Sequence, residues 1–216
     1  MLFNTSSINN VEFRRSNESL EAVALGMDLH PEDVVASILG SSEQSLAILE
    51  YVARVIAMDI DSNQINISIL RLRILKEGNM KRFKSLLPYS KEEDGGDFIS
   101  NVKDNKKYLS MERLDRISKK LMALDILYED IFDVDPLKMP FNKLYISNAL
   151  NYGYGQAMNI QSLGIIASKM PKNGLIYSAT DDHLEKSIKS IVAEEDLTHK
   201  ARMKEHKWNP IIYRII

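Results

Sequence analysis

The most informative absence in this sequence is cysteine, because none of its 216 residues is one. That absence excludes disulfide frameworks, thiol nucleophiles, iron–sulfur clusters and cysteine-based zinc sites. A long apolar run is also missing: Glu50 and Arg54 interrupt residues 46–58, whereas a membrane-spanning helix needs about 20 apolar residues. Residues 1–10 lack the basic start and apolar core of a secretory signal peptide. We therefore expect a chain without a membrane span, located in the cytoplasm or incorporated into a virion or secretion assembly.

An excess of either charge is missing as well, since 28 Lys and Arg residues stand against 30 Asp and Glu residues. The formal charge of -2 attracts the chain neither to nucleic acid nor to an anionic membrane. The charges nevertheless lie in blocks. Residues 71–84 are mainly basic, residues 92–97 and 125–135 are mainly acidic, and residues 136–180 contain no acidic residue. This arrangement indicates several surfaces of different charge and not one surface of mixed charge.

Catalytic motifs are absent too. The sequence contains no P-loop, no Gly-x-Ser-x-Gly elbow and no His-Glu-x-x-His motif. Gly153-Tyr154-Gly155 lacks the third glycine of a dinucleotide-binding fingerprint. These absences favour a non-catalytic protein without a cofactor, although a site assembled only in space would leave no motif.

Helical periodicity dominates what is present. We predict helices after Asn17, from Pro31 to Leu39, and from a capping box at Ser41. The strongest pattern covers residues 110–132, where apolar residues follow the 3-4-3-4-3 heptad spacing. These residues are Leu114, Ile117, Leu121, Leu124, Tyr128 and Ile131.

Residues 65–75 are ambiguous. Ile65, Ile67 and Ile69 alternate as in a strand, but the apolar phase then slips. A phase slip is harder to accommodate in a strand, which favours a helix. Just before it, Asp59-Ile60-Asp61 resembles the opening of a calcium loop. The sixth and twelfth positions lack the required glycine and glutamate, so Asp61 or Ser62 is better explained as a helix N-cap.

Further helices are predicted at residues 141–150 and 156–169, and a long one after Thr180-Asp181-Asp182. We therefore predict an all-α fold, a multi-helix bundle with a small N-terminal helical lobe and an extended apolar C-terminal tail. The expected divisions are the lobe at 1–89, a charged linker at 90–109, and the bundle with a docking tail at 110–216.

The sequence features that suggest a function are those of a binding surface. Leaving the apolar tail in water would cost several kcal/mol, at about 1.5–3 kcal/mol per large side chain, so the tail must dock on this chain or on another. We predict a non-catalytic subunit or adaptor of a larger assembly, such as a virus or phage particle or secretion machinery. Its partners would be other protein subunits, identical or different. The expected interface residues are Tyr152, Tyr154, Trp208, Ile211, Ile212, Tyr213, Ile215 and Ile216.

Two alternatives stay open. The first is a nucleic-acid-binding regulator, because basic residues with interleaved aromatics suit phosphate contacts and base stacking. Its candidate residues are Arg71, Arg73, Lys76, Lys81, Arg82, Lys84, Lys200, Arg202, Lys204 and Lys207. The second is a metal-dependent enzyme. Glu195, His199 and His206 would share one face of a continuous helix and could bind zinc, iron or manganese there.

Overall fold

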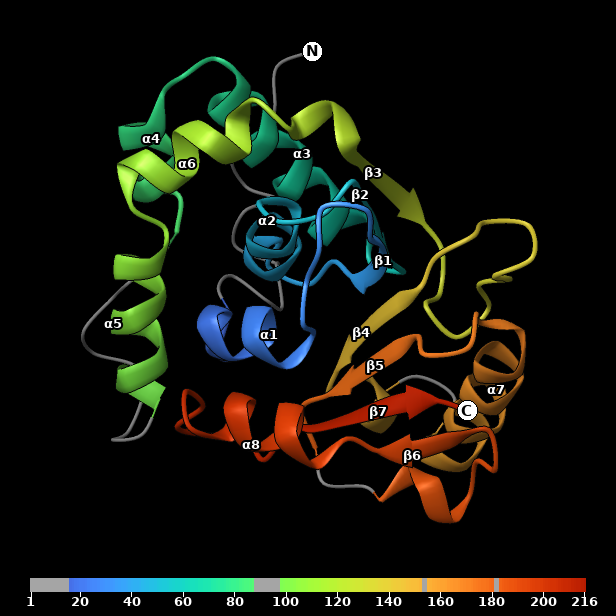
Figure 1. The fold of residues 1–216 in the computed structure, drawn as a ribbon. Helices are drawn as coiled ribbons and strands as arrows, with labels where there is room; N and C mark the ends of the chain where they lie inside the picture. The colour runs from blue at the N-terminus through green and yellow to red at the C-terminus, as the bar shows by residue number, and fades with distance from the viewer. Residues whose placement is uncertain (1–15, 88–97, 153–154, 181–182) are drawn as a thin grey trace.

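The computed structural model describes residues 16–87, 98–152, 155–180 and 183–216. These residues form a seven-stranded sheet with the order β3-β2-β1-β4-β5-β7-β6 (Figure 1). The strands are β1 (Val34–Ile38), β2 (Arg54–Asp59), β3 (Leu124–Tyr128), β4 (Lys143–Ser147), β5 (Leu175–Ser178), β6 (Ile191–Ala193) and β7 (Ile211–Ile215). The sheet combines strands from both sides of the predicted linker at 90–109.

The first five strands are all parallel, and β7 pairs antiparallel with both β5 and β6. From β1 the chain moves outward to β2 and β3, and then returns to place β4 against the other side of β1. The direction of winding therefore reverses between β1 and β4. In open α/β sheets, ligands bind outside the carboxyl ends of the strands at such a reversal.

Helices cover both faces of the sheet. The α-helices are α1 (Leu20–Gly26), α2 (Glu43–Leu49), α3 (Ser62–Lys76), α4 (Met80–Ser85), α5 (Phe98–Tyr108), α6 (Met111–Ser118), α7 (Gln156–Lys169) and α8 (Glu195–Arg202). Three short 3-10 helices are η2 (Leu121–Ala123), η3 (Ala149–Asn151) and η4 (Leu184–Lys186). Local capping sets several starts. The Asp61 side chain accepts from the Asn63 N–H at the start of α3, which confirms the expected N-cap.

Strand residues alternate between two hydrophobic layers. Val35, Tyr145 and Tyr177 belong to the layer that α1, α2, α3, α4, α6 and α8 cover. Ala36 and Leu144 belong to the other layer, which α7 covers. Because both faces are buried, the central strands are apolar on both sides.

The predicted all-α fold is therefore wrong. The structure is a doubly wound α/β fold, and the apolar run Val34–Ile38 is a strand where we expected a helix. The expected helix at 141–150 contains β4. Strands buried on both faces lose the alternation that identifies a strand, so a short run of this kind reads equally well as helix.

The heptad pattern at 110–132 does not form one helix either. Helix α6 ends at Ser118, and the same apolar series continues into β3. The long helix expected after residue 180 is also absent from residues 183–216, which contain η4, β6 and the eight-residue α8. In contrast, α3 and α7 lie where the sequence predicts helices.

The apolar C-terminal tail is an internal strand. Strand β7 lies between β5 and β6, and Ile211, Ile212, Tyr213 and Ile215 are buried (Figure 1). The tail was expected to dock either on this chain or on another, and it docks on this chain. Among the large apolar side chains of the tail, Ile216 at its end is the exposed one, with 58% of its surface accessible.

Gly26 allows α1 to pack closely on α8, β5 and β7. A Cβ at this position would lie 3.0 Å from Ala201 Cβ and Tyr177 Cε2, and 3.1 Å from Ile212 Cδ1. All three neighbours are fully buried and have little room to shift. We expect Gly26→Ala to lower the free energy of unfolding by about 1–2 kcal/mol, because overpacking outweighs the gain in helix propensity. Chemical denaturation measures this change, and unchanged or increased stability would contradict it.

None of the helices in the described parts of the chain combines the length and the apolar character that crossing a bilayer requires. The expectations for residues 1–10, for the acidic segment 92–97 and for Asp181 and Asp182 fall outside the described residues.

Candidate functional site

The turn after β1 directs the chain from the sheet into α2. Two residues of this turn, Gly40 and Ser42, have positive φ angles of 46° and 66°. The Ser42 N–H donates to the Leu39 carbonyl at 2.7 Å, which closes the turn. Glycine adopts this left-handed conformation without strain, and at Gly40 it lets the backbone turn sharply at the edge of the sheet. The turn therefore lies at the carboxyl end of β1, beside β4.

Asp59, the last residue of β2, connects β2 to the turn after β1 through a hydrogen bond. Its Oδ2 accepts from the Gly40 N–H at 3.2 Å, and its Oδ1 accepts from the Asp61 N–H at 2.9 Å. Burial raises the pKa of the Asp59 carboxyl, while the backbone N–H groups of Asp61, Gly40 and Ile60 oppose that rise. An ionised carboxylate offers about four acceptor positions, so about one stays available to a ligand.

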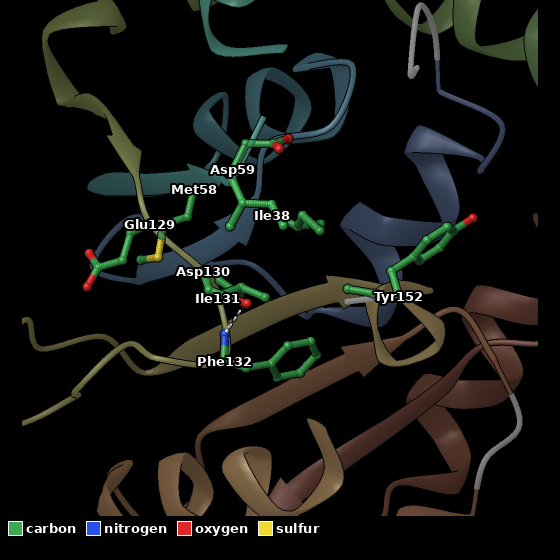
Figure 2. Close-up of a pocket in the computed structure, with 10 residues that line it drawn as sticks. Ile38, Met58, Asp59, Glu129, Asp130, Ile131, Phe132 and Tyr152 are labelled. Carbon is green, nitrogen blue, oxygen red and sulfur yellow. Dashed lines mark hydrogen bonds between the residues drawn. The ribbon is translucent and has the colours of Figure 1, made fainter. Parts of the chain in front are cut away.

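A pocket of about 380 Å³, part of it open to solvent, lies at the ends of β2 and β3, and we call it the β2–β3 pocket (Figure 2). Its residues come from the ends of neighbouring strands and from η3. They are Ile38, Met58, Asp59, Ile60, Glu129, Asp130, Ile131, Phe132, Ala149 and Tyr152. Asp130 accepts from the Phe132 N–H at 2.9 Å, which holds the loop after β3 in place. The lining combines apolar walls with carboxyl groups.

A second pocket of about 400 Å³, also partly open, lies at the ends of β1 and β4, and we call it the β1–β4 pocket. Its lining residues are Ser16, Asn17, Glu18, Ile38, Leu39, Gly40, Ser41, Gln44, Tyr145, Ser147 and Asn148. Ile38 lines both pockets, and Asn148 precedes Ala149 of the other pocket. The two pockets are therefore neighbours along the carboxyl edge of the sheet.

The electrostatics of the two pockets are one-sided. Among the described residues, their linings contain the carboxyl groups of Glu18, Asp59, Glu129 and Asp130, but no Lys or Arg. Glu18 is fully buried beside Ser147, whose hydroxyl donates to it. Burial is the main cause that raises the Glu18 pKa to about 7, and the nearby Glu205 carboxyl raises it further. The combined site suits a ligand with positive charge better than an anion.

The predicted interface residues have different surroundings. Tyr152 lines the β2–β3 pocket and is about half exposed, while Tyr154 lies outside the described residues. Trp208 is partly buried against the core. The β7 residues of the set are inside the sheet, so only Ile216 and Tyr152 present large exposed surfaces.

One residue of the predicted basic cluster at 71–84 does not reach the surface. Arg71 is buried in α3, and its guanidinium donates to the carbonyls of Ser41 and Leu86. Arg73, Lys76, Lys81 and Arg82 are exposed, and Lys84 is partly so. In the second cluster, Lys200, Arg202, Lys204 and Lys207 are exposed. Lys204 pairs with Glu21 at 3.0 Å.

The candidate metal site does not assemble. Helix α8 ends at Arg202, so His206 lies beyond the helix that carries Glu195 and His199. All three side chains are exposed, and His206 Nε2 lies 3.5 Å from Asp104. Within the described residues, no group of three His, Asp or Glu side chains could hold a metal ion.

Sequence reasoning missed both acids that define the site. For Asp59 a signal existed: an acid follows an apolar run, as expected at the end of a buried parallel strand. For Glu18 no signal existed, because it lies far in sequence from Ser147 and Tyr145, and only folding brings them together.

A scan against protein-family models and a search of curated proteins find no match. Solved structures do share the fold. The [4+2]-cyclase SpnF superposes with a TM-score of 0.52 at 8% identity, over 91% of this chain and 79% of the cyclase. An rRNA methylase from Streptococcus thermophilus gives 0.48 at 9% identity, over 90% and 93%. The N-methyltransferase NodS from Bradyrhizobium japonicum, solved with S-adenosyl-L-homocysteine, gives 0.47 at 7% identity, over 90% and 83%.

These findings correct the functional prediction. The expected non-catalytic subunit of a virion or secretion assembly rested largely on the apolar tail as an interface with a neighbouring subunit, and that tail is an internal strand of this chain's own α/β sheet. The expectation of a protein that is not an enzyme rested on missing motifs, but the α/β sheet places two adjoining pockets where its winding reverses, the position at which such sheets bind ligands. The nucleic-acid-binding alternative stays a prediction. The residues expected to bind a metal do not come together in the described part of the chain.

Proposed function

We propose that this chain binds S-adenosylmethionine and catalyses transfer of its methyl group to an acceptor. The observation that carries the proposal is the position and charge of the two adjoining pockets. They lie where the winding of the sheet reverses, and the described residues that line them include four carboxyl groups and no basic side chain. S-adenosylmethionine carries a sulfonium and an ammonium against a single carboxylate, so it has a net positive charge.

The β2–β3 pocket fits the nucleoside part of this cofactor. An acid at the end of the second strand is the group that binds ribose hydroxyls in doubly wound folds. Asp59 holds this position, and about one of its four acceptor positions remains for a hydroxyl donor after the backbone N–H groups of Gly40, Ile60 and Asp61. Ile38, Met58 and Ile131 provide apolar surface for a base.

The turn after β1 argues against a dinucleotide or another phosphate ligand. A pyrophosphate binds to a glycine-rich turn and the N-terminus of the following helix. Here the first residue of that helix is the buried Glu43, whose carboxylate accepts from the Ser16 N–H at 3.0 Å. Arg71 reaches the turn from α3, but its guanidinium is buried against carbonyl groups. A nucleoside without phosphate therefore fits the turn better.

When bound, the cofactor supplies a methyl group activated by the positive sulfur. The methyl carbon forms a bond to a lone pair of the acceptor while the carbon–sulfur bond breaks, and that bond's electrons stay on sulfur. The protein must align donor and acceptor and exclude water. The β1–β4 pocket, with Ser147 and Asn148 at the end of β4, lies next to the nucleoside site and provides the place for this encounter.

Calorimetric titration with S-adenosylhomocysteine tests the proposal. We expect the wild-type chain to bind this product, and Asp59→Asn to bind it about 10–100-fold more weakly, because charge-assisted bonds to the ribose are lost. Asp115→Asn is the matched control, since Asp115 is exposed on α6 and pairs with Lys119. Its affinity should equal that of the wild type. No binding by the wild type, or equal affinity in Asp59→Asn, would contradict the proposed site.

A further inference from the structure

Glu18 has a buried carboxyl group, and within the described residues only one of its two oxygens has a hydrogen bond. Only 1% of the residue is exposed, and one carboxyl oxygen accepts from the Ser147 hydroxyl. The other oxygen, Oε2, has no hydrogen-bond partner in the described part of the chain. A buried acceptor without a partner costs about 1–3 kcal/mol, and more when it is charged. The Tyr145 hydroxyl is near enough to lower the pKa of this carboxyl as a donor, but a neutral hydroxyl brings no positive charge to Oε2.

The groups that face Glu18 do not balance its charge. Tyr145 from β4 and Tyr177 from β5 present hydroxyl groups, and Glu205, which follows α8, adds a second carboxyl. Glu205 is already an acceptor for the backbone N–H groups of Ser19 and His206. Among the described residues, Glu18 forms no ion pair with Lys, Arg or His. No cation among the described residues therefore neutralises the ionised form of Glu18.

The position of Glu18 indicates which kind of ligand could supply a positive charge to its carboxylate. Glu18 lines the β1–β4 pocket together with the turn after β1 and the end of β4. Building on the proposed function, we propose that the Glu18 carboxylate binds a protonated nitrogen of the ligand that enters this pocket. The nitrogen can be the ammonium of the cofactor's amino-acid end or an amine at the methyl-acceptor position. The bond is charge-assisted, N⁺–H to O⁻, and fills the open position on Oε2.

Binding of this nitrogen is linked to loss of a proton from Glu18. In the free protein, burial raises the pKa of Glu18 to about 7, so below that pH the carboxyl is mostly neutral. An ammonium favours the ionised form, and the proton passes to the buffer. At pH 6.5 the release should be about three quarters of a proton per ligand. Between pH 6 and pH 8 the affinity for an ammonium ligand should rise about 10-fold.

Three probes separate the sources of the nitrogen. S-adenosylhomocysteine carries the amino-acid ammonium, 5′-methylthioadenosine lacks it, and sinefungin carries a further amine where the cofactor has its methyl group. Each is titrated by calorimetry at pH 6.5 in two buffers of different ionisation enthalpy, which yields the number of protons released. Release with S-adenosylhomocysteine and sinefungin alone supports the proposal with the amino-acid end as the source. Release with sinefungin alone supports it with the acceptor position as the source.

The Glu18→Gln variant is the control for the group that titrates. It should bind S-adenosylhomocysteine or sinefungin without proton release and with a flat affinity between pH 6 and pH 8. The wild-type pH profile gives the same information without any variant, should Glu18→Gln fail to fold. Binding without proton release in the wild type, release with 5′-methylthioadenosine, or release that persists in Glu18→Gln would overturn the proposal and leave the proposed function standing. If none of the probes binds, the proposed function fails, and this inference fails with it.

Discussion

Deleting residues 208–216 is expected to leave a chain that cannot fold. The deletion removes β7, which pairs with both β5 and β6, so β6 loses its only strand partner and β5 gains an open edge. It also removes four buried side chains, Ile211, Ile212, Tyr213 and Ile215. At about 1.5–3 kcal/mol each, their burial contributes roughly 6–12 kcal/mol. That is comparable to the whole free energy of unfolding of a typical domain, about 5–15 kcal/mol.

Circular dichroism and denaturant titration measure this effect. The truncated chain should lack a cooperative unfolding transition. A milder version is Ile212→Ala, which leaves a cavity among fully buried neighbours and should cost about 2–5 kcal/mol. Ile216→Ala is the matched control, because Ile216 is exposed and should change stability by less than about 0.5 kcal/mol. A truncated chain that unfolds cooperatively with near-native stability would contradict the role of β7.

Replacing Glu18 by Gln is expected to stabilise the ligand-free protein at neutral and higher pH. The native pKa of Glu18 is about 7, raised from an ordinary value of 4.5 mainly by burial. A raised carboxyl pKa means that the stability present below pH 4.5 is lost as the pH rises through 7. At about 1.4 kcal/mol per pKa unit, the loss amounts to about 3 kcal/mol. Glutamine has no proton to lose and avoids the loss.

The measurement is the free energy of unfolding of both chains between pH 5 and pH 8.5. Glu18→Gln should be more stable than the wild type by about 1 kcal/mol at pH 5, and this difference should grow to about 3 kcal/mol at pH 8.5. Glu21→Gln is the matched control, since Glu21 lies three residues further on, in α1, but is about half exposed and pairs with Lys204. Its difference from the wild type should stay small across this range. A pH-independent difference for Glu18→Gln would mean that Glu18 has an ordinary pKa.

The fold separates acidic from basic side chains, although their numbers nearly balance. Counted over the whole chain, acids and bases nearly cancel at -2. The fold gathers Glu18, Asp59, Glu129 and Asp130 at one edge of the sheet. It places Arg73, Lys76, Lys81 and Arg82 on α3 and α4. The chain is therefore nearly neutral overall but has an acidic pocket, and the local negative charge of that pocket attracts a cationic nucleoside.

Some of this structure could be predicted from local sequence. Helices α3 and α7 lie where periodicity placed them, and Asp61 caps α3 as its side chain allows. A cap involves residues two or three positions apart, so its information is contained in a short stretch of chain. The absence of cysteine excluded whole classes of chemistry for the same reason: it depends on composition and not on folding.

Whether an apolar run became helix or strand was decided elsewhere. Val34–Ile38 and Lys143–Ser147 satisfy their backbone hydrogen bonds through each other and through β2 and β5, which are distant in the chain. The residues 114–131 kept a heptad spacing, yet their second half became β3 because β2 offered a free edge. Pairing of this kind depends on partners that no local pattern identifies.

The site belongs entirely to the tertiary structure. The sequence alone determined a chain without thiol chemistry, with several capped helices and an apolar tail that had to be buried. Only folding determined that the tail fills a sheet, that Asp59 meets Gly40, and that Glu18 lies against Ser147 although 129 positions separate them. The physical reason is the distance along the chain over which each kind of interaction acts. Capping and periodicity act within a few residues, whereas a binding pocket needs side chains that only long-range packing brings together.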